Sequence, residues 1–198
     1  MRYRDPMRNV RWALALTALV SLVALRGGTL SATSYTPVSF EELVTKADVI
    51  FVGDVLDVRP FTVATPEGDA IKTRVTFMVR DAIWGTTHTL ESFEFLGGVV
   101  GNRELRVAEM PTFKAGDRRM VFASRARSIN PIIGFTQGLM RVSADPSGVD
   151  VVQTSDGAPL ASLQDIGRPN AARLRSGRAM PLSSLRAQVV TLLRERRR

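Results

Sequence analysis

The amino-acid sequence predicts a mostly β domain of five or six strands, with a short helix before the strands and a second helix at the C-terminus. Runs of β-branched and aromatic residues alternate with polar residues, a pattern typical of strands that bury one face. Segments rich in Pro, Gly and Asp separate these runs, as turns do. The chain has 198 residues, of which 44% are hydrophobic and 23% are charged, and these values suit one globular domain.

The first 32 residues have the arrangement of a secretory signal peptide. Four arginines precede an apolar run at residues 12–25, which leads to small residues that end at Ala32. As a helix this run would measure about 21 Å, less than the ~30 Å hydrocarbon layer of a membrane. We therefore expect residues 1–32 to be removed, no membrane span to remain, and the mature protein to be secreted or periplasmic. An uncleaved N-terminal anchor is the alternative.

The mature chain is expected to begin with a short helix. Ser39 and Glu42 have the spacing of a capping box, in which each side chain accepts a hydrogen bond from the backbone of the other residue. Phe40, Leu43 and Val44 would then form one apolar face, which we expect to pack against a sheet.

Six segments have the residue pattern of strands. Residues 71–80 give the clearest signal, because Val75, Phe77 and Val79 alternate with polar residues such as Lys72. The strands are predicted at residues 48–58, 71–80, 89–96, 119–123, 138–143 and 149–152.

Three segments between these strands are predicted as loops. Residues 60–70, with Pro, Glu, Gly and Asp near the centre, suit a hairpin connection. Residues 97–116 and 124–134 are too long for simple turns, and long irregular segments often carry function. We expect any functional surface to lie on these two segments.

The organisation of the chain follows from these elements. After the signal peptide at residues 1–32, the β domain is expected at residues 33–152. Residues 153–182 are rich in Ser, Asp, Gly and Pro, and they are predicted to be an extended connector. Residues 183–198 are predicted to be a basic helix, whose apolar stripe would contain Leu185, Val189 and Leu192.

The formal net charge of +8 comes from the two ends of the chain. Residues 1–32 hold five Arg and one Asp, a net +4, and residues 167–198 hold nine Arg and one Glu, a net +8. Residues 33–166 hold 13 Lys or Arg and 17 Asp or Glu, a net −4, so we expect no specific nucleic acid partner. The last arginines could contact an anionic surface or form a solvated helix end. They are Arg194, Arg196, Arg197 and Arg198.

The sequence contains no motif for catalysis, cofactor binding or metal binding. It has no cysteine and one histidine, His88, which excludes a thiolate nucleophile and a multi-histidine zinc site. It also lacks the Gly-x-Ser-x-Gly motif of a strained serine nucleophile. Glu91 and Glu94 are predicted to be surface charges on opposite faces of a strand. Asp145 and Asp150 lack the order of a calcium loop, and a hairpin turn explains their segment.

Five segments together suggest a family. They are Ala-Asp-Val-Ile-Phe-Val-Gly-Asp-Val at residues 47–55, Thr-Phe-Met-Val-Arg-Asp-Ala-Ile-Trp-Gly at 76–85, Phe-Leu-Gly-Gly at 95–98, Pro-Thr-Phe-Lys-Ala-Gly-Asp at 111–117, and Ile-Gly-Phe-Thr-Gln-Gly-Leu-Met-Arg-Val at 133–142. The chain resembles a group of uncharacterised secreted bacterial proteins over residues 38–152. More distantly, it is similar to the OB-fold of netrin-like modules and tissue inhibitors of metalloproteinases.

This resemblance implies an OB-like, partly open Greek-key barrel of five strands. The metalloproteinase inhibitors use an N-terminal cysteine to chelate the zinc of the protease, and they use disulfides to hold the barrel. This chain has no cysteine, so the resemblance implies the fold and not the inhibitory mechanism.

The sequence favours an exported, non-enzymatic module that binds a protein or an envelope component through its loops. Two alternatives are left open. One is a secreted hydrolase whose catalytic residues come from different loops and form no motif. The other is attachment to an anionic surface through the arginine-rich C-terminus.

Overall fold

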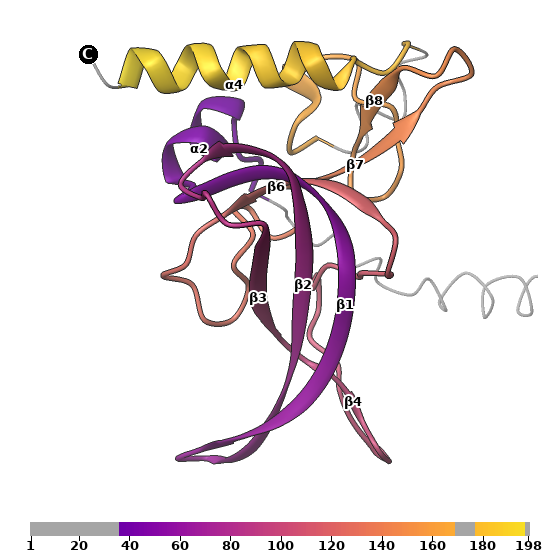
Figure 1. The fold of residues 1–198 in the computed structure, drawn as a ribbon. Coiled ribbons are helices and arrows are strands. Elements are labelled where there is room, and N and C mark those ends of the chain that lie inside the picture. Colours follow the sequence, from indigo (N-terminus) through magenta and orange to yellow (C-terminus); the bar gives the residue numbers. More distant parts are fainter. Residues whose placement is uncertain (1–35, 169–176, 197–198) are drawn as a thin grey trace, which may run out of the picture. The chain divides into compact units, whose positions relative to one another are not determined.

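The computed structural model describes residues 36–168 and 177–196, and Figure 1 shows how their helices and strands are arranged. The predicted signal peptide lies outside these residues. Helix α2 (Phe40–Lys46) begins at the predicted capping box. The Ser39 Oγ accepts a hydrogen bond from the Glu42 N–H at 3.2 Å, and the Glu42 carboxylate accepts one from the Ser39 N–H at 3.1 Å. These bonds satisfy N–H groups that the first turn of a helix leaves unpaired.

All six predicted strands are present, and they form one antiparallel sheet in the order β3-β2-β1-β6-β7-β8. The strands are β1 (Val49–Thr65), β2 (Gly68–Trp84), β3 (Leu90–Leu96), β6 (Arg118–Ala123), β7 (Leu139–Ala144) and β8 (Asp150–Gln153). A second, two-stranded sheet pairs β4 (Gly98–Val100) with β5 (Arg103–Leu105), inside a segment that was predicted to be irregular. The prediction of a mostly β fold is therefore confirmed.

The main sheet is open, and its strands do not close into a barrel. Closure would require β3 to pair with a strand from the other half of the sheet. However, β7 pairs on its outer side with β8, and among the described strands β3 pairs with β2 alone. In this respect the sheet differs from the predicted barrel, because the free side of β7 is occupied by its own hairpin partner.

The β1–β2 hairpin is longer than predicted. Both strands have 17 residues, and a two-residue turn at Pro66 and Glu67 joins them, so residues 60–70 are mostly strand and not loop. β6 pairs with β1 only at residues 49–54. The later part of β1 is therefore an edge on that side, where Pro60 is tolerated because proline cannot donate to a neighbouring strand.

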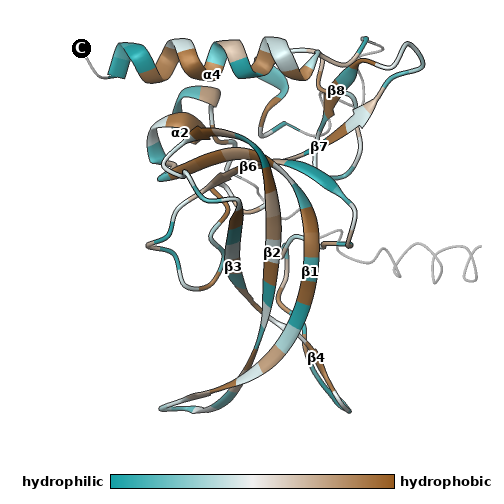
Figure 2. Cartoon of the chain, viewed as in Figure 1, coloured by the Kyte–Doolittle hydropathy of each residue, from teal (hydrophilic) through white to brown (hydrophobic). Residues whose placement is uncertain are grey.

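Burial on both faces of the sheet explains the continuous apolar run at the start of β1. Ile50 and Val52 face a cluster that includes buried residues of α2 and of helix α4 (Leu182–Arg196). Val49 and Phe51 face a second cluster on the opposite side of the sheet. Figure 2 shows hydrophobic residues gathered at the start of β1 and on β6.

The predicted faces of β2 are confirmed. Val75 and Phe77 are fully buried in the second cluster, and Val79 packs against it. Lys72 lies on the other face and makes an ion pair with Glu94 at 3.5 Å.

The chain after β8 packs on the main sheet. Leu160 and Ile166 lie in the same cluster as the two helices, although residues 153–182 were predicted to be an extended connector. A 3-10 turn, η1 (Leu163–Asp165), separates these two buried residues. Residues 169–176 lie outside the described residues.

Helix α4 covers the sheet with one apolar stripe. Its buried residues are Leu185, Val189 and Leu193, whereas Leu192, which was predicted to belong to this stripe, is half-buried. Arg186 binds the Asp81 carboxylate with two hydrogen bonds, of 2.5 and 3.1 Å, and so fixes the helix to β2. Within the described ranges, no helix has both the length and the apolar character that crossing a membrane requires.

Candidate functional site

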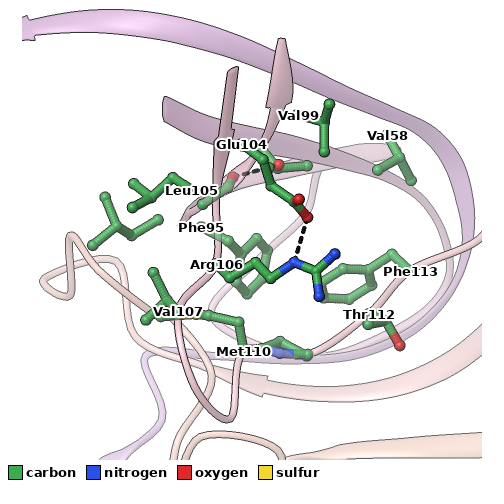
Figure 3. Close-up of a pocket in the computed structure, with 15 residues that line it drawn as sticks. Val58, Phe95, Val99, Glu104, Leu105, Arg106, Val107, Met110, Thr112 and Phe113 are labelled. Carbon is green, nitrogen blue, oxygen red and sulfur yellow. Dashed lines mark hydrogen bonds and ion pairs between the residues drawn. The ribbon is translucent and has the colours of Figure 1, made fainter. Parts of the chain in front are cut away.

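A mostly apolar cavity of about 410 Å³ lies between the end of β3, the β4–β5 hairpin and residues 106–113 (Figure 3). Most of its wall comes from residues 97–113, part of one of the two irregular segments that were expected to carry function. Its apolar lining includes Val58, Phe95, Leu96, Val99, Leu105, Val107, Met110 and Phe113. We call this space the apolar cavity.

Two glycines allow the backbone to form one wall of the apolar cavity. Gly97 and Gly98 both have positive φ angles, of 107° and 136°. A Cβ added to Gly98 would lie 2.4 Å from the Thr73 Oγ1, so β4 could not approach β2 as closely with any other residue there. The Thr73 hydroxyl donates a 2.7 Å hydrogen bond to the Gly97 carbonyl and holds this approach.

Phenylalanine rings form a rigid base for the apolar cavity. The rings of Phe95 and Phe113 lie 4.8 Å apart, and those of Phe77 and Phe113 lie 5.9 Å apart in an edge-to-face arrangement. Phe113 comes from the irregular segment and Phe77 from the middle of β2. The rings therefore join the loop to the sheet beside the cavity.

One ion pair lies among the residues that line the apolar cavity. The Arg106 Nε donates a 2.6 Å hydrogen bond to the Glu104 carboxylate, and both side chains are exposed (Figure 3). The same hydrogen bond raises the pKa of the Arg106 guanidinium above its ordinary value. The two charged groups thus neutralise each other, and most of the other residues that line the cavity are apolar.

A second hollow, of about 320 Å³, lies beside β3. We call it the β3 groove. One wall is β3 itself, and the other is the loop at residues 124–131, which belongs to the second irregular segment. The lining consists of Lys72, Ser92, Phe93, Glu94, Ser124, Arg125, Arg127, Ser128 and Pro131.

A partly buried polar network fixes the loop that borders the β3 groove. The Asp48 carboxylate accepts hydrogen bonds from the Ser124 hydroxyl at 2.6 Å and from the Arg125 N–H at 3.1 Å. The Arg125 guanidinium donates to the Glu91 carboxylate at 2.8 Å. Glu91 is only 6% exposed, so the prediction that it is a surface charge was wrong. Its charge is tolerated in the interior because Arg125 neutralises it.

Glu91 and Glu94 lie on opposite faces of β3, as predicted from their spacing. Glu94 is half-buried and accepts a 2.8 Å hydrogen bond from Arg74. This hydrogen bond is the largest reason why the pKa of Glu94 lies below its ordinary value, and Lys72 also contributes. The two carboxylates are therefore held by different cations and do not form an acid–base pair.

The other sequence-derived candidates lie apart from both hollows. Arg194 and Arg196 are exposed in the last turn of α4, whereas Arg197 and Arg198 lie outside the described residues. His88 is exposed between β2 and β3, and across residues 36–168 and 177–196 its ring makes no hydrogen bond to a hydroxyl or carboxylate.

Asp145 stabilises the turn between β7 and β8. Its carboxylate accepts hydrogen bonds from the Ser147 hydroxyl, the Arg178 guanidinium and the Val149 N–H. These bonds hold the pKa of Asp145 well below its usual range. In the part of the chain that the structure describes, no three His, Cys, Asp or Glu side chains form a group that could hold a metal ion.

The sequence predicted the two irregular segments but not the hollows that they line. The β4–β5 hairpin was missed because each of its strands has only three residues, too few to show a period of two. The glycines at residues 97, 98 and 101 were the one signal of its sharp backbone path. Comparisons of the chain with protein-family models, curated proteins and solved structures find no match, so the functional conclusion depends on the geometry of the apolar cavity and the β3 groove.

Proposed function

We propose that the protein is an exported, non-enzymatic binding module that holds an apolar group of a partner protein or envelope component in the apolar cavity. The observation that carries the proposal is the composition of this cavity, with packed phenylalanine rings, mostly apolar lining residues and one exposed ion pair. Ligand sites in proteins are commonly preformed and apolar, with few polar groups. Burial of a leucine-sized group in such a site contributes about 1.5–3 kcal/mol.

The hydrolase alternative has less support. Such an enzyme needs polar groups that converge on one point, with a nucleophile or a water next to a base. The apolar cavity contains one carboxylate, that of Glu104, and Arg106 already neutralises it. In the β3 groove the Ser124 hydroxyl is committed to Asp48, which fixes the loop.

We also propose that the open sheet is related to the OB-fold. Strands β1, β2 and β3 form a meander, and β6 returns to pair with β1 on its other side. An OB-fold begins with a three-stranded meander, and its first strand also pairs with a later one. The likeness supports a scaffold that displays its connecting loops, and it implies no particular ligand.

A dye titration tests whether the apolar cavity binds. The probe is N-phenyl-1-naphthylamine, a neutral apolar dye whose fluorescence rises in apolar surroundings. Thr112 is exposed and lines the cavity, so Thr112→Trp should fill the space without disturbing the core. We expect this variant to bind the dye about tenfold more weakly than the unmodified protein, a loss of roughly 1.4 kcal/mol.

Lys114→Trp is the matched control. Lys114 is also exposed and lies two residues further along, but it does not line the apolar cavity. Its substitution adds the same ring to the surface and should leave the affinity for the dye unchanged. Equal affinities for the two variants, or no saturable binding by the unmodified protein, would contradict the proposal.

A further inference from the structure

Strand β3 is an edge of the main sheet, and most of its outer hydrogen-bonding groups have no partner among the described residues. The Val79 N–H donates to the Thr89 carbonyl and the Gly97 N–H donates to the Ile71 carbonyl, so odd-numbered residues face β2. Even-numbered residues of β3 therefore direct their N–H and C=O groups away from the sheet. Among these, the described structure pairs only Leu96, whose N–H donates to the Ile129 carbonyl at 2.9 Å. The outward N–H and C=O groups of Leu90, Ser92 and Glu94 therefore have no hydrogen-bond partner among the described residues.

At the opposite edge of the sheet, outer backbone groups of strand β8 are paired. The Val152 N–H of β8 donates to the Met180 carbonyl at 2.9 Å, and the Val152 carbonyl accepts from the Leu160 N–H at 3.1 Å. Bridges to Pro159 and Pro181 lie on either side of these bonds. Proteins usually protect edge strands with such cover, or with proline, inward charges or bulges. β3 has no proline, its register with β2 is continuous from Leu90 to Leu96, and its inward charge, Glu91, is neutralised by Arg125.

The space beside this open edge is the β3 groove. The loop at residues 124–131 forms its far wall, and in Figure 1 this loop lies beside β3. The hydrogen bond between Leu96 and Ile129 joins the loop to β3, and the part-buried contact between Asp48 and Ser124 fixes the start of the loop. At Ser92 and Glu94 the edge thus faces a hollow of about 320 Å³.

The charges that line the β3 groove favour an acidic occupant. Three lining residues are cations, namely Lys72, Arg125 and Arg127, and one, Glu94, is an anion. Lys72 pairs with Glu94, and Arg125 pairs with the buried Glu91. Arg127 donates to the Ile132 carbonyl at 2.9 Å, but it makes no ion pair with a carboxylate in the described residues. One exposed positive charge therefore remains available in the groove.

We propose that the β3 groove binds an extended segment of a partner protein, which adds to β3 as a further strand and places an Asp or Glu side chain at Arg127. The open N–H and C=O groups of Ser92 and Glu94 would bind the backbone of the segment, as in other cases of strand addition. Arg127 would select for a carboxylate, because a charge-assisted hydrogen bond is stronger than a neutral one. This inference concerns a different surface from the apolar cavity and does not depend on it.

The test uses short peptides of defined composition. Each is a capped nonapeptide of alternating Val and Thr with a central Glu, and a second peptide has Gln in place of the Glu. A third carries N-methyl groups on alternate residues along the edge that would face β3, which removes its hydrogen bonds to the strand. We expect the Glu peptide to bind, the Gln peptide to bind several-fold more weakly, and the N-methylated peptide to show no binding at roughly 1 mM.

Two substitutions of Ser92 separate strand addition from other modes of binding. Ser92→Pro removes an outward N–H, and proline is tolerated on edge strands, whereas Ser92→Ala keeps that N–H. Both remove the same 3.0 Å contact with Thr76. We expect the proline variant to bind the Glu peptide about tenfold more weakly than the alanine variant. Arg127→Ala should abolish the preference for Glu over Gln while it leaves binding of the Gln peptide unchanged.

Amide hydrogen exchange on the unmodified protein gives an independent readout. Added Glu peptide should slow exchange at Ser92 and Glu94, and exchange at the inward-facing Phe93 and Phe95 should change little. The proposal is overturned if no peptide binds at roughly 1 mM, if the two Ser92 variants bind equally, or if protection appears elsewhere on the protein. The Thr112→Trp variant should bind the peptides normally, so failure of the apolar cavity proposal would be seen separately.

Discussion

At the scale of single residues, Phe77 contacts more aromatic rings than any other residue of the described core. Its ring meets those of Phe51 at 5.5 Å, Phe93 at 6.4 Å and Phe113 at 5.9 Å. Phe77→Ala should therefore lower the free energy of unfolding by about 3–5 kcal/mol, the usual cost of emptying a large core site. Urea denaturation measures this change. Lys72→Ala, on the opposite face of β2, should change the value by less than about 0.5 kcal/mol.

Two residues near the apolar cavity test the cost of a positive φ angle. Glu109 has φ of 62°, a conformation that disfavours residues with a Cβ, and Glu109→Gly should raise the free energy of unfolding by roughly 0.5–1 kcal/mol. Gly116 has φ of 89° and open space around its missing Cβ, so Gly116→Ala should lower that free energy through the backbone alone. Effects of the same sign in the two variants would show that backbone conformation does not control stability at these turns.

At the scale of elements, Asp54 connects three strands. Its carboxylate in β1 accepts hydrogen bonds from Arg80 of β2 at 2.7 Å and from Arg118 of β6 at 2.8 Å. Partial burial raises the pKa of Asp54, but the hydrogen bonds to Arg118 and Arg80 outweigh burial and lower the pKa below its ordinary value. A carboxylate with a lowered pKa in the folded state contributes stability above its unfolded pKa of about 3.9.

That contribution should be lost as the pH falls below about 4 and Asp54 becomes protonated. Asp54→Asn mimics the protonated group, so the variant should be less stable than the unmodified protein at neutral pH. The difference in the free energy of unfolding should shrink as the pH falls below about 4. Denaturation at a series of pH values provides the measurement, and a difference that stays constant over this range would contradict the prediction.

The sequence was informative about elements and less so about their assembly. The six strands of the main sheet and the capping box at Ser39 were predictable because local period and spacing determine them. The open state of the sheet was not predictable, because it depends on β7 pairing with β8, a contact between elements. The apolar cavity was missed for the same reason, since Phe95 and Phe113 come together only through the path of the chain between them.

At the scale of the whole molecule, charge is separated along the sequence. Residues 33–166 carry a net −4, and residues 167–198 carry a net +8. Helix α4 is fixed to the sheet by its buried stripe and by the contact between Arg186 and Asp81. Arg194 and Arg196 are exposed at its end, and neither makes an ion pair within the described ranges. The end of α4 is therefore basic, whereas residues 33–166 carry a net negative charge.

This arrangement predicts salt-dependent binding of residues 33–198 to vesicles that contain anionic lipid. Each arginine near such a surface contributes about 1 kcal/mol, so Arg194→Glu with Arg196→Glu should weaken partition into the vesicles at least about thirtyfold. The control is Arg59→Glu with Lys114→Glu, which changes the net charge equally at exposed positions of the β domain. Sedimentation with vesicles, at low and at physiological salt, measures the partition of each variant. If both double variants lose binding equally, net charge and not the end of α4 controls attachment. If only the α4 variant loses it, the C-terminal arginines are the contact, because the acidic body repels the same surface.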